Sequence, residues 1–200
     1  RGLVGSEMCI RDRCYEAGIT VTSLPGACAC ITALTMSGQP TRRFAFEAFL
    51  PYDKKERAQI LENLRNETRT IIIYEAPHHL KKTLKECREY LGNRNMTVCK
   101  ELTKRYEQKR KSTLDEMIAY YEENEPRGEY VLIFEGKSLQ ELKEEKQQEW
   151  NQLTVQEHME HYLEKGMDKK SAMKQVAKDR GVSKRDIYQA VSYTHLTLPT

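Results

Sequence analysis

An uninterrupted apolar run, Ile71–Ile73, constrains the fold of this 200-residue chain more than any other feature. The run is followed by the sequence YEAPH at Tyr74–His78, and together they predict a buried strand that ends and turns into a helix. Pro77 suits the first turn of that helix, where its missing N–H would be unpaired anyway. Open α/β sheets bind ligands at such strand ends, so the polar residues here predict a site.

Two later segments also combine an apolar strand with a polar group. The predicted strand Met96–Lys100 runs into Glu101–Lys104, and the predicted strand Tyr130–Phe134 follows Arg127–Glu129. Because three strands begin or end at such groups, we expect the groups to form one site. Taken alone, the polar group from Glu101 to Glu107 fits a solvated loop better.

Strand and helix patterns alternate up to about residue 136. Strands are expected at 19–22, 44–50, 70–74, 96–100 and 130–134, and helices at 27–36, 54–66, 77–91 and 113–123. A polar stretch runs from the end of the fourth strand to Ser112. Alternation of this kind predicts an α/β fold with a largely parallel sheet.

From Ser138 onward the strand pattern disappears, and Glu, Lys and Gln dominate. Helices are expected at 140–151, 154–165, 168–179 and 184–190, with a tight turn at Arg180–Val182 and Ser183 as the cap of the last helix. Two helices joined by a short turn that contains Gly are typical of the helix-turn-helix. Charge is uneven here: residues 138–165 hold seven Glu against three Lys, and residues 166–187 hold seven Lys or Arg against three Asp.

Both ends of the chain are expected to be non-native. Met8–Asp12 can be encoded by codons whose reverse complement encodes Val191–His195, and this sequence resembles the translated end of a transposon adaptor. Residues 1–13 and 191–200 are therefore left out of the fold prediction. A corollary is that the native protein continues in both directions.

Composition argues against several classes of protein. The formal net charge of +3 is too small for binding a polyanion through bulk charge alone. No apolar run approaches the ~20 residues that cross a membrane, so no membrane partner is expected. Five cysteines lie between Cys14 and Ala190, without a C-x-x-C pair. An odd number in this arrangement indicates reduced thiols in a cytoplasmic protein rather than a disulfide or zinc framework.

Each candidate site has an alternative structural explanation. Pro25–Ala29 opens a helix with small residues that let a ligand approach free N–H groups, but a plain strand-to-helix turn is favoured on the pattern alone. Tyr74–His78 fits a site and a turn equally well. His158 and His161 lie one helical turn apart, yet two histidines without further ligands are usually packed or solvated, so no metal site is expected. Four basic residues of the tail fit phosphate contacts or a solvated face equally well: Lys178, Arg180, Lys184 and Arg185.

Five segments in this order resemble motifs of the ribosomal RNA cytidine 2′-O-methyltransferases of the tetrapyrrole methylase superfamily. They are PGACACITAL at 25–34, AFLP at 48–51, YEAPHH at 74–79, ELTK at 101–104 and GEYVL at 128–132. The stretch from Gly166 to Tyr188 is similar to the C-terminal extension of the same family. Any one motif is weak evidence, but the five in order and the tail cover essentially all of residues 14–190.

The resemblance implies an enzyme that uses S-adenosylmethionine to methylate a cytidine ribose of 16S rRNA, with the small ribosomal subunit as its partner. It also implies that residues 14–40 end a Rossmann-like N-terminal domain, that 41–137 form a mixed-sheet α/β domain, and that 138–190 form a helical extension. Cofactor contacts are implied at Pro25, Gly26, Cys28, Ala29, Glu75, Ala76, Ser112 and Thr113. RNA contacts are implied at His78, Lys178, Lys184 and Arg185.

Glu101 and Lys104 are the candidates for catalysis. A ribose hydroxyl is a weak acid, so a nearby base or a cation that stabilises the alkoxide would assist methyl transfer. Ala27, Cys28 and Ser112 replace the Pro, Ser and Gly of the family, which weakens the hydrogen bonds implied there. The family's first strand and its GDAGTP loop are not in this chain, so we expect the chain as given to bind cofactor poorly and to be inactive.

Two rival interpretations stay open. A tetrapyrrole methylase that acts on a porphyrin-like small molecule would have no need of a basic helical tail. A non-enzymatic nucleic-acid-binding module with an inert α/β body is compatible with the composition. The residues do not decide whether the protein forms a homodimer.

Overall fold

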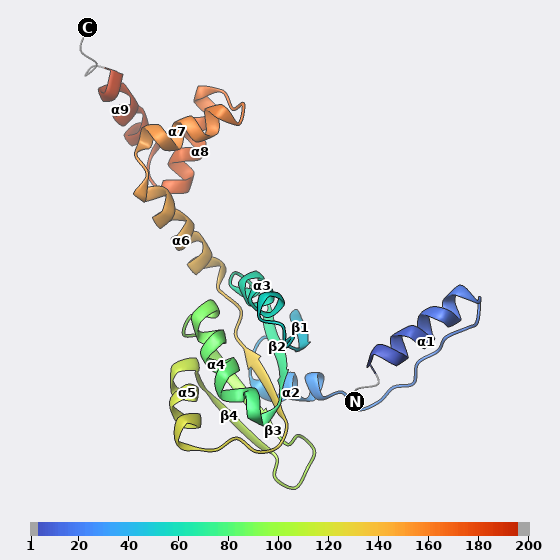
Figure 1. Ribbon diagram of the computed structural model, residues 1–200. Coiled ribbons are helices and arrows are strands. Elements are labelled where there is room, and N and C mark those ends of the chain that lie inside the picture. The colour runs from blue at the N-terminus through green and yellow to red at the C-terminus, as the bar shows by residue number, and fades with distance from the viewer. Residues whose placement is uncertain (1–3, 196–200) are drawn as a thin grey trace.

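The computed structural model describes residues 4–195, with side-chain positions for residues 10–191. A five-stranded sheet with helices on both faces forms the body, and a helical tail extends from it (Figure 1). The strand order is β1-β2-β5-β3-β4, with β1 (Phe44–Phe49), β2 (Thr70–Glu75), β3 (Asn95–Lys100), β4 (Gln108–Thr113) and β5 (Tyr130–Phe134). The helices of the body are α2 (Ala29–Ser37), α3 (Lys54–Leu64), α4 (Pro77–Leu91) and α5 (Leu114–Glu123).

The sheet is mixed, as the resemblance implied for residues 41–137, whereas the strand–helix alternation alone predicted a largely parallel sheet. β1 pairs parallel with β2, whereas β5 is antiparallel to both β2 and β3, and β4 is antiparallel to β3. The strand–helix alternation correctly gives β1, β2 and β3 one common direction, but β5 inserts between β2 and β3 in the opposite direction. Two local details also differ from the prediction: residues 19–22 form no strand, and β4 begins in the polar stretch 101–112 and ends at Thr113, where a helix was expected to start.

Apolar side chains fill both faces of the sheet. On one face Ile71 and Ile73 pack against the core formed with α3, α4 and α5, and on the other Ile72 and Ile133 pack against α2. β2 therefore has no polar face, which explains why its sequence is a continuous apolar run rather than an alternating one. α2, which we expected at the end of a separate domain, shares its core with this sheet.

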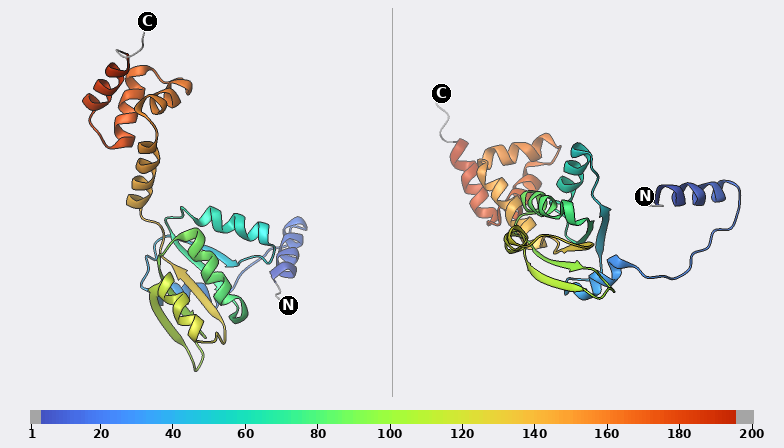
Figure 2. Two further views of the ribbon diagram at one scale, coloured as in Figure 1. Left: turned by 60° about the vertical axis from the view of Figure 1, so that its left-hand side comes forward. Right: turned by 60° about the horizontal axis from the view of Figure 1, so that its bottom comes forward.

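The N-terminal segment lies apart from the body. α1 (Val4–Glu16) joins α2 through an extended segment that belongs to no sheet (Figures 1 and 2). The expected non-native ends, residues 1–13 and 191–200, fall partly outside the described residues. Between residues 4 and 195, no helix is long and apolar enough to span a membrane.

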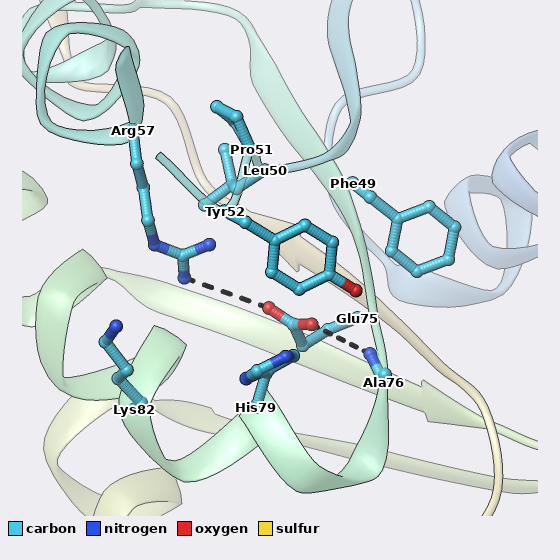
Figure 3. Close-up of a pocket in the computed structure, with 9 residues that line it drawn as sticks. All are labelled: Phe49, Leu50, Pro51, Tyr52, Arg57, Glu75, Ala76, His79 and Lys82. Carbon is cyan, nitrogen blue, oxygen red and sulfur yellow. Dashed lines mark hydrogen bonds and ion pairs between the residues drawn. The ribbon is translucent and has the colours of Figure 1, made fainter. Parts of the chain in front are cut away.

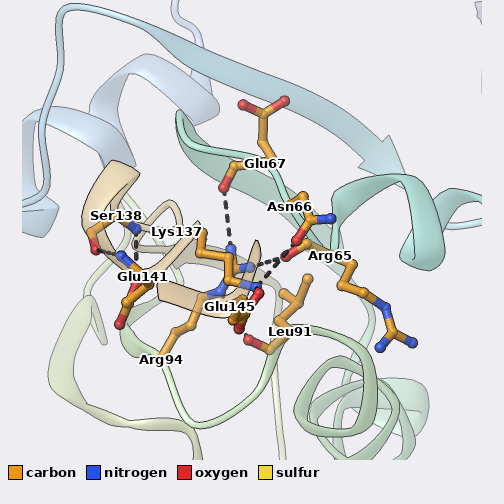
Figure 4. Close-up of polar contacts among 9 residues, drawn as sticks. All are labelled: Arg65, Asn66, Glu67, Leu91, Arg94, Lys137, Ser138, Glu141 and Glu145. Atoms are coloured by element: carbon orange, nitrogen blue, oxygen red, sulfur yellow. Dashed lines mark hydrogen bonds and ion pairs between the residues drawn. The ribbon is translucent and has the colours of Figure 1, made fainter. Parts of the chain in front are cut away.

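A polar junction holds the start of α6 (Leu139–Gln152) against the body (Figure 4). The backbone N–H of Lys137 donates to the Glu67 carbonyl at 2.7 Å, and its Nζ donates to Asn66 at 3.1 Å and to Glu145 of α6. Ser138 caps α6 through a capping box with Glu141. These contacts attach the first turns of the tail to the loops beside the sheet.

The remaining tail helices are α7 (Val155–Glu164), α8 (Lys169–Arg180) and α9 (Lys184–His195), which share a small core of their own. Met159, Val176 and Ile187 are buried there, one from each helix. Gly181, with a φ of 65°, ends α8 in the left-handed conformation that glycine tolerates best. The expected two helices joined by a short turn are therefore present, and the second helix runs on to His195.

Candidate functional site

The carboxyl ends of β1, β2 and β3 lie at one edge of the sheet, where β5 begins between the last two. Tyr130, the first residue of β5, pairs with Glu75 on one side and with Lys100 on the other. The three polar groups that we expected to form one site therefore meet. Within the described residues, the non-glycine positions with a positive φ also lie at this edge: Ala48, Glu101 and Thr103. Backbone strain of this kind is frequent at functional sites.

A cavity of about 420 Å³ opens over the end of β2 and the start of β5. It brings together three residues with implied cofactor contacts, Ala29, Glu75 and Ala76. The rest of its wall is mostly apolar and consists of Phe49, Tyr74, Pro77, Leu102, Glu129, Tyr130 and Val131. An apolar wall with a few polar groups is typical of sites for small ligands, which span roughly 300–1,000 Å³.

A second cavity, also of about 420 Å³, adjoins the first and shares Phe49, Glu75 and Ala76 with it. Aromatic rings from two elements form much of its wall (Figure 3). Tyr52 and His79 meet edge to face with 5.5 Å between ring centroids. The lining is completed by Leu50, Pro51, Arg57 and Lys82.

Glu75 stands between the two cavities and is only 5% exposed. Its Oε1 accepts the Ala76 N–H at 2.8 Å, and its Oε2 accepts the hydroxyl of Thr83. Arg57 lies 3.9 Å from Oε2, donates to Thr83 at 2.6 Å and pairs with Glu86 at 2.6 Å. Burying a carboxylate is costly unless its oxygens are paired, and this network supplies the partners that hold it in one position.

The loop after β3 ties Glu101 and Lys104 to the start of β5. Glu101 Oε1 accepts the backbone N–H of Glu129 at 2.8 Å and Lys104 Nζ at 3.1 Å, while Lys104 also donates to Glu129 Oε2 at 2.9 Å. The close approach requires Gly128, because a Cβ there would lie 2.5 Å from Glu101 Oε1. The Glu129 N–H, and then the Lys104 ammonium, lower the pKa of Glu101, whereas the carboxylates of Glu129 and Glu101 raise the pKa of Lys104.

Cys28 and Cys30 flank the start of α2. Cys28 is exposed, and its Sγ lies 3.3 Å from that of Cys30, whose N–H donates to the Tyr74 hydroxyl at 2.9 Å. The Ile31 N–H, and then the Cys30 thiol, lower the pKa of Cys28, while burial raises the pKa of Cys30. Cys28 and the preceding Pro25–Gly26 segment, all with implied cofactor contacts, line neither cavity.

The other predicted site residues lie away from this edge or on its rim. Ser112 and Thr113 pair with the start of β3, at the opposite end of the strands, where Thr113 caps α5. His78 is exposed on the first turn of α4, beside His79. The predicted RNA contacts of the tail are exposed on α8 and α9: Lys178, Lys184 and Arg185. No cluster of three potential metal ligands occurs in the part of the chain that the structure describes.

The family model for tetrapyrrole (corrin/porphyrin) methylases matches residues 2–118 of this chain. The chain belongs to this family. Among curated relatives, the ribosomal RNA small subunit methyltransferase I of Halalkalibacterium halodurans is 47% identical over 86% of this chain and 59% of its own length. The protein of the same name from Bacillus subtilis is 46% identical over 88% of this chain and 60% of its own. The chain thus spans about 60% of the length of these relatives.

A solved tetrapyrrole methylase shows the same fold at low sequence identity. The cobalamin biosynthetic enzyme cobalt precorrin-4 methyltransferase superposes with a TM-score of 0.50 and 17% identity, over 66% of this chain and 59% of its own. At this identity the likeness concerns the fold alone.

Several residues at the edge of this methylase sheet were not predicted from the sequence. Thr83 and Arg57 hold Glu75, and each interrupts an otherwise apolar stripe of its helix. A polar residue within a buried stripe was therefore an available signal. Phe49 and Tyr130 line the cavities and lie within the AFLP and GEYVL motifs, which were the available signal, although no contact was assigned to either residue.

Proposed function

We propose that the protein is an S-adenosylmethionine-dependent methyltransferase that modifies a cytidine ribose 2′-oxygen in small-subunit rRNA. The observation that carries this proposal is the 46–47% identity to relatives named ribosomal RNA small subunit methyltransferase I. The cobalt precorrin-4 methyltransferase, in contrast, is only 17% identical, so the alternative of a small-molecule methylase has weaker support.

The lining of the cavity over β2 and β5 fits S-adenosylmethionine. Ala29 and Ala76 are small enough to let a ligand approach the backbone, and Tyr74 and Leu102 offer apolar surface. Glu75 supplies a fixed carboxylate that can balance a cationic ligand. When bound, the cofactor would supply a methyl group on a cationic sulfonium. The further contacts implied at Cys28, Ser112 and Thr113 lie outside this cavity.

Lys104 is the better of the two catalytic candidates. Two carboxylates raise its pKa, so it carries a full positive charge near neutral pH and can stabilise the alkoxide that develops on a ribose oxygen. Glu101 has a lowered pKa and is a weak base. Its role is to position Lys104 and the Glu129 backbone, with which it makes hydrogen bonds.

The helical extension, residues 138–190, is proposed to dock rRNA through the basic residues of α8 and α9. Lys178, Lys184 and Arg185 are exposed there and would contact phosphates. The α/β body, residues 41–137, would hold the chemistry.

The test uses a protein extended to the full length of its relatives. Small subunits that lack the modification are incubated with S-adenosylmethionine carrying a tritiated methyl group, and the methylated nucleotide is mapped by its resistance to alkaline cleavage. Lys104→Ala should lower kcat by roughly 10²-fold, as for loss of one oxyanion donor, with little change in cofactor affinity. Glu101→Gln should lower kcat less, because Lys104 keeps its charge.

Lys85→Ala is the control, since Lys85 is an exposed cation on α4 that pairs with Glu122 at 3.0 Å, away from the cavities. Unchanged turnover in Lys104→Ala would remove this residue from the mechanism. Methylation of a porphyrin-like acceptor but not of RNA would contradict the proposed substrate.

A further inference from the structure

Strand β4 and the loop that precedes it concentrate positive charge. Residues 100–111, which we name the basic hairpin, hold six Lys or Arg against two Glu. The cations are Lys100, Lys104, Arg105, Lys109, Arg110 and Lys111. In Figure 1 the turn of this hairpin extends past the edge of the sheet where β5 begins, which is the edge that holds the two cavities.

Most of this charge is not neutralised by the protein. Within the described residues, Lys104 alone among the six has a carboxylate within ion-pair distance. Arg110 instead lies over the ring of Tyr120, 3.7 Å from its centroid, where it keeps its charge. On α4, by contrast, four cations are paired: Lys81 with Glu125, Lys82 with Glu86, Lys85 with Glu122 and Arg88 with Asp115. Apart from Lys104, the hairpin therefore concentrates positive charge that no nearby carboxylate of the described residues compensates.

The hairpin also presents a free edge and an aromatic ring. β4 is the last strand of the sheet, so its outer edge has no neighbour among the described strands. Lys109 and Lys111 are exposed and both point to the α2 side, because they pair with residues of β3 that contact α2. Tyr106 is 67% exposed in the turn, with the Arg105 guanidinium 5.6 Å from its ring centroid. Cations interleaved with an exposed aromatic ring are typical of surfaces that bind single-stranded nucleic acid.

We propose that the basic hairpin is a second RNA-backbone contact, separate from the helical tail, that leads the RNA strand to the cavities. This inference rests on the proposed function, because it takes RNA as the substrate. Leu102 of the hairpin lines the cavity over β2 and β5, so a strand bound along the hairpin arrives at the site. The tail leaves the sheet from the opposite end of β5, so RNA held by both surfaces spans the body (Figure 1).

Lysines on an edge strand also have a simpler role, since they prevent pairing with the sheet of another molecule. That role explains Lys109 and Lys111. It does not explain the exposed Tyr106 at the turn, which would favour association rather than prevent it. Neutralising the lysines would weaken RNA binding if they contact RNA, and would promote aggregation if they protect the sheet edge.

The test compares two double variants that remove the same charge. Lys109→Gln/Lys111→Gln neutralises the hairpin, and Lys143→Gln/Lys146→Gln neutralises two exposed lysines of α6. Binding of a fluorescein-labelled, 30-nucleotide single strand of small-subunit rRNA to the 200-residue chain is followed by anisotropy from 20 to 300 mM salt. Each phosphate contact to a single strand adds about 0.7 to the magnitude of the slope of log K against log salt, so the hairpin variant, which removes two contacts, should lose about 1.4. The α6 variant should keep the slope of the unmodified chain.

Equal slopes for the two variants would overturn the proposal, as would failure of the unmodified chain to bind this RNA at 20 mM salt. Aggregation of the hairpin variant with undiminished RNA binding would assign the lysines to edge protection instead. Tighter binding to phosphatidylserine vesicles than to RNA would assign the surface to a membrane. Methyl transfer to rRNA is measured separately, so failure of the proposed function and failure of the hairpin contact are distinguishable.

Discussion

Thr83 should be the most sensitive position of the polar network beneath the cavities. Its side chain is fully buried, and its hydroxyl donates to Glu75 while accepting from Arg57 at 2.6 Å. Thr83→Val keeps the shape of the side chain but removes both hydrogen bonds. Thr83→Ser keeps both hydrogen bonds but removes a methyl group, which makes it the matched control.

The magnitudes follow from what each variant leaves unpaired. Without the hydroxyl, Glu75 Oε2 loses its closest donor and Arg57 loses an acceptor, and both groups are largely buried. A buried polar group that loses its partner costs about 1–3 kcal/mol, so two such groups predict a destabilisation of about 2–6 kcal/mol. The serine variant should cost only about 1 kcal/mol, as expected for one buried methyl group.

Hydrogen exchange measured by mass spectrometry, with added urea, follows this part of the molecule specifically. In peptides that cover β2 and α4, the free energy of opening derived from exchange should fall by the amounts given above for each variant. In peptides of α7–α9 it should not change. If Thr83→Val destabilises β2 and α4 no more than Thr83→Ser does, the network does not hold Glu75 in the way described.

Two further predictions concern the tail and the tail junction. Burial lowers the pKa of His158, so the unfolded imidazole binds a proton more readily than the folded one. Tail stability should therefore be at its full value above pH about 6.5 and fall as the pH drops below it, an effect that His158→Gln should abolish. Trp150, the single tryptophan, stacks on His158 with 3.9 Å between ring centroids, so its fluorescence reports unfolding of the tail. A urea midpoint that does not change with pH would contradict this prediction. At Gly136 a Cβ would overlap the backbone of Thr68, so Gly136→Ala should lower stability by about 1–3 kcal/mol or more in thermal melts, whereas Gly26→Ala, which meets no atom within 4 Å, should be near neutral.

The sequence predicts best the elements whose burial leaves a pattern. Ile71–Ile73 is buried on both faces of the sheet, and its apolar run predicts β2 to within one residue. The Pro77–Leu91 helix has one apolar stripe and is predicted with its exact bounds. β4 was missed because Lys109–Lys111 are exposed on an edge strand, and the strand is held by backbone pairing with β3 rather than by burial. The extended segment 19–22 has strand-like residues but finds no partner strand among the described residues.

The composition of the candidate site depends on tertiary structure in a way that local patterns do not encode. Motifs at Glu75 and Glu101 mark two strand ends, but their meeting requires β5 to insert antiparallel between β2 and β3, so that Tyr130 pairs with residues at both ends. The same insertion places Glu129 beside this loop, where its backbone N–H lowers the pKa of Glu101 and its carboxylate raises the pKa of Lys104. The sequence alone thus offers Glu101 as a base and Lys104 as a cation. The pKa shifts that follow from the strand order favour Lys104.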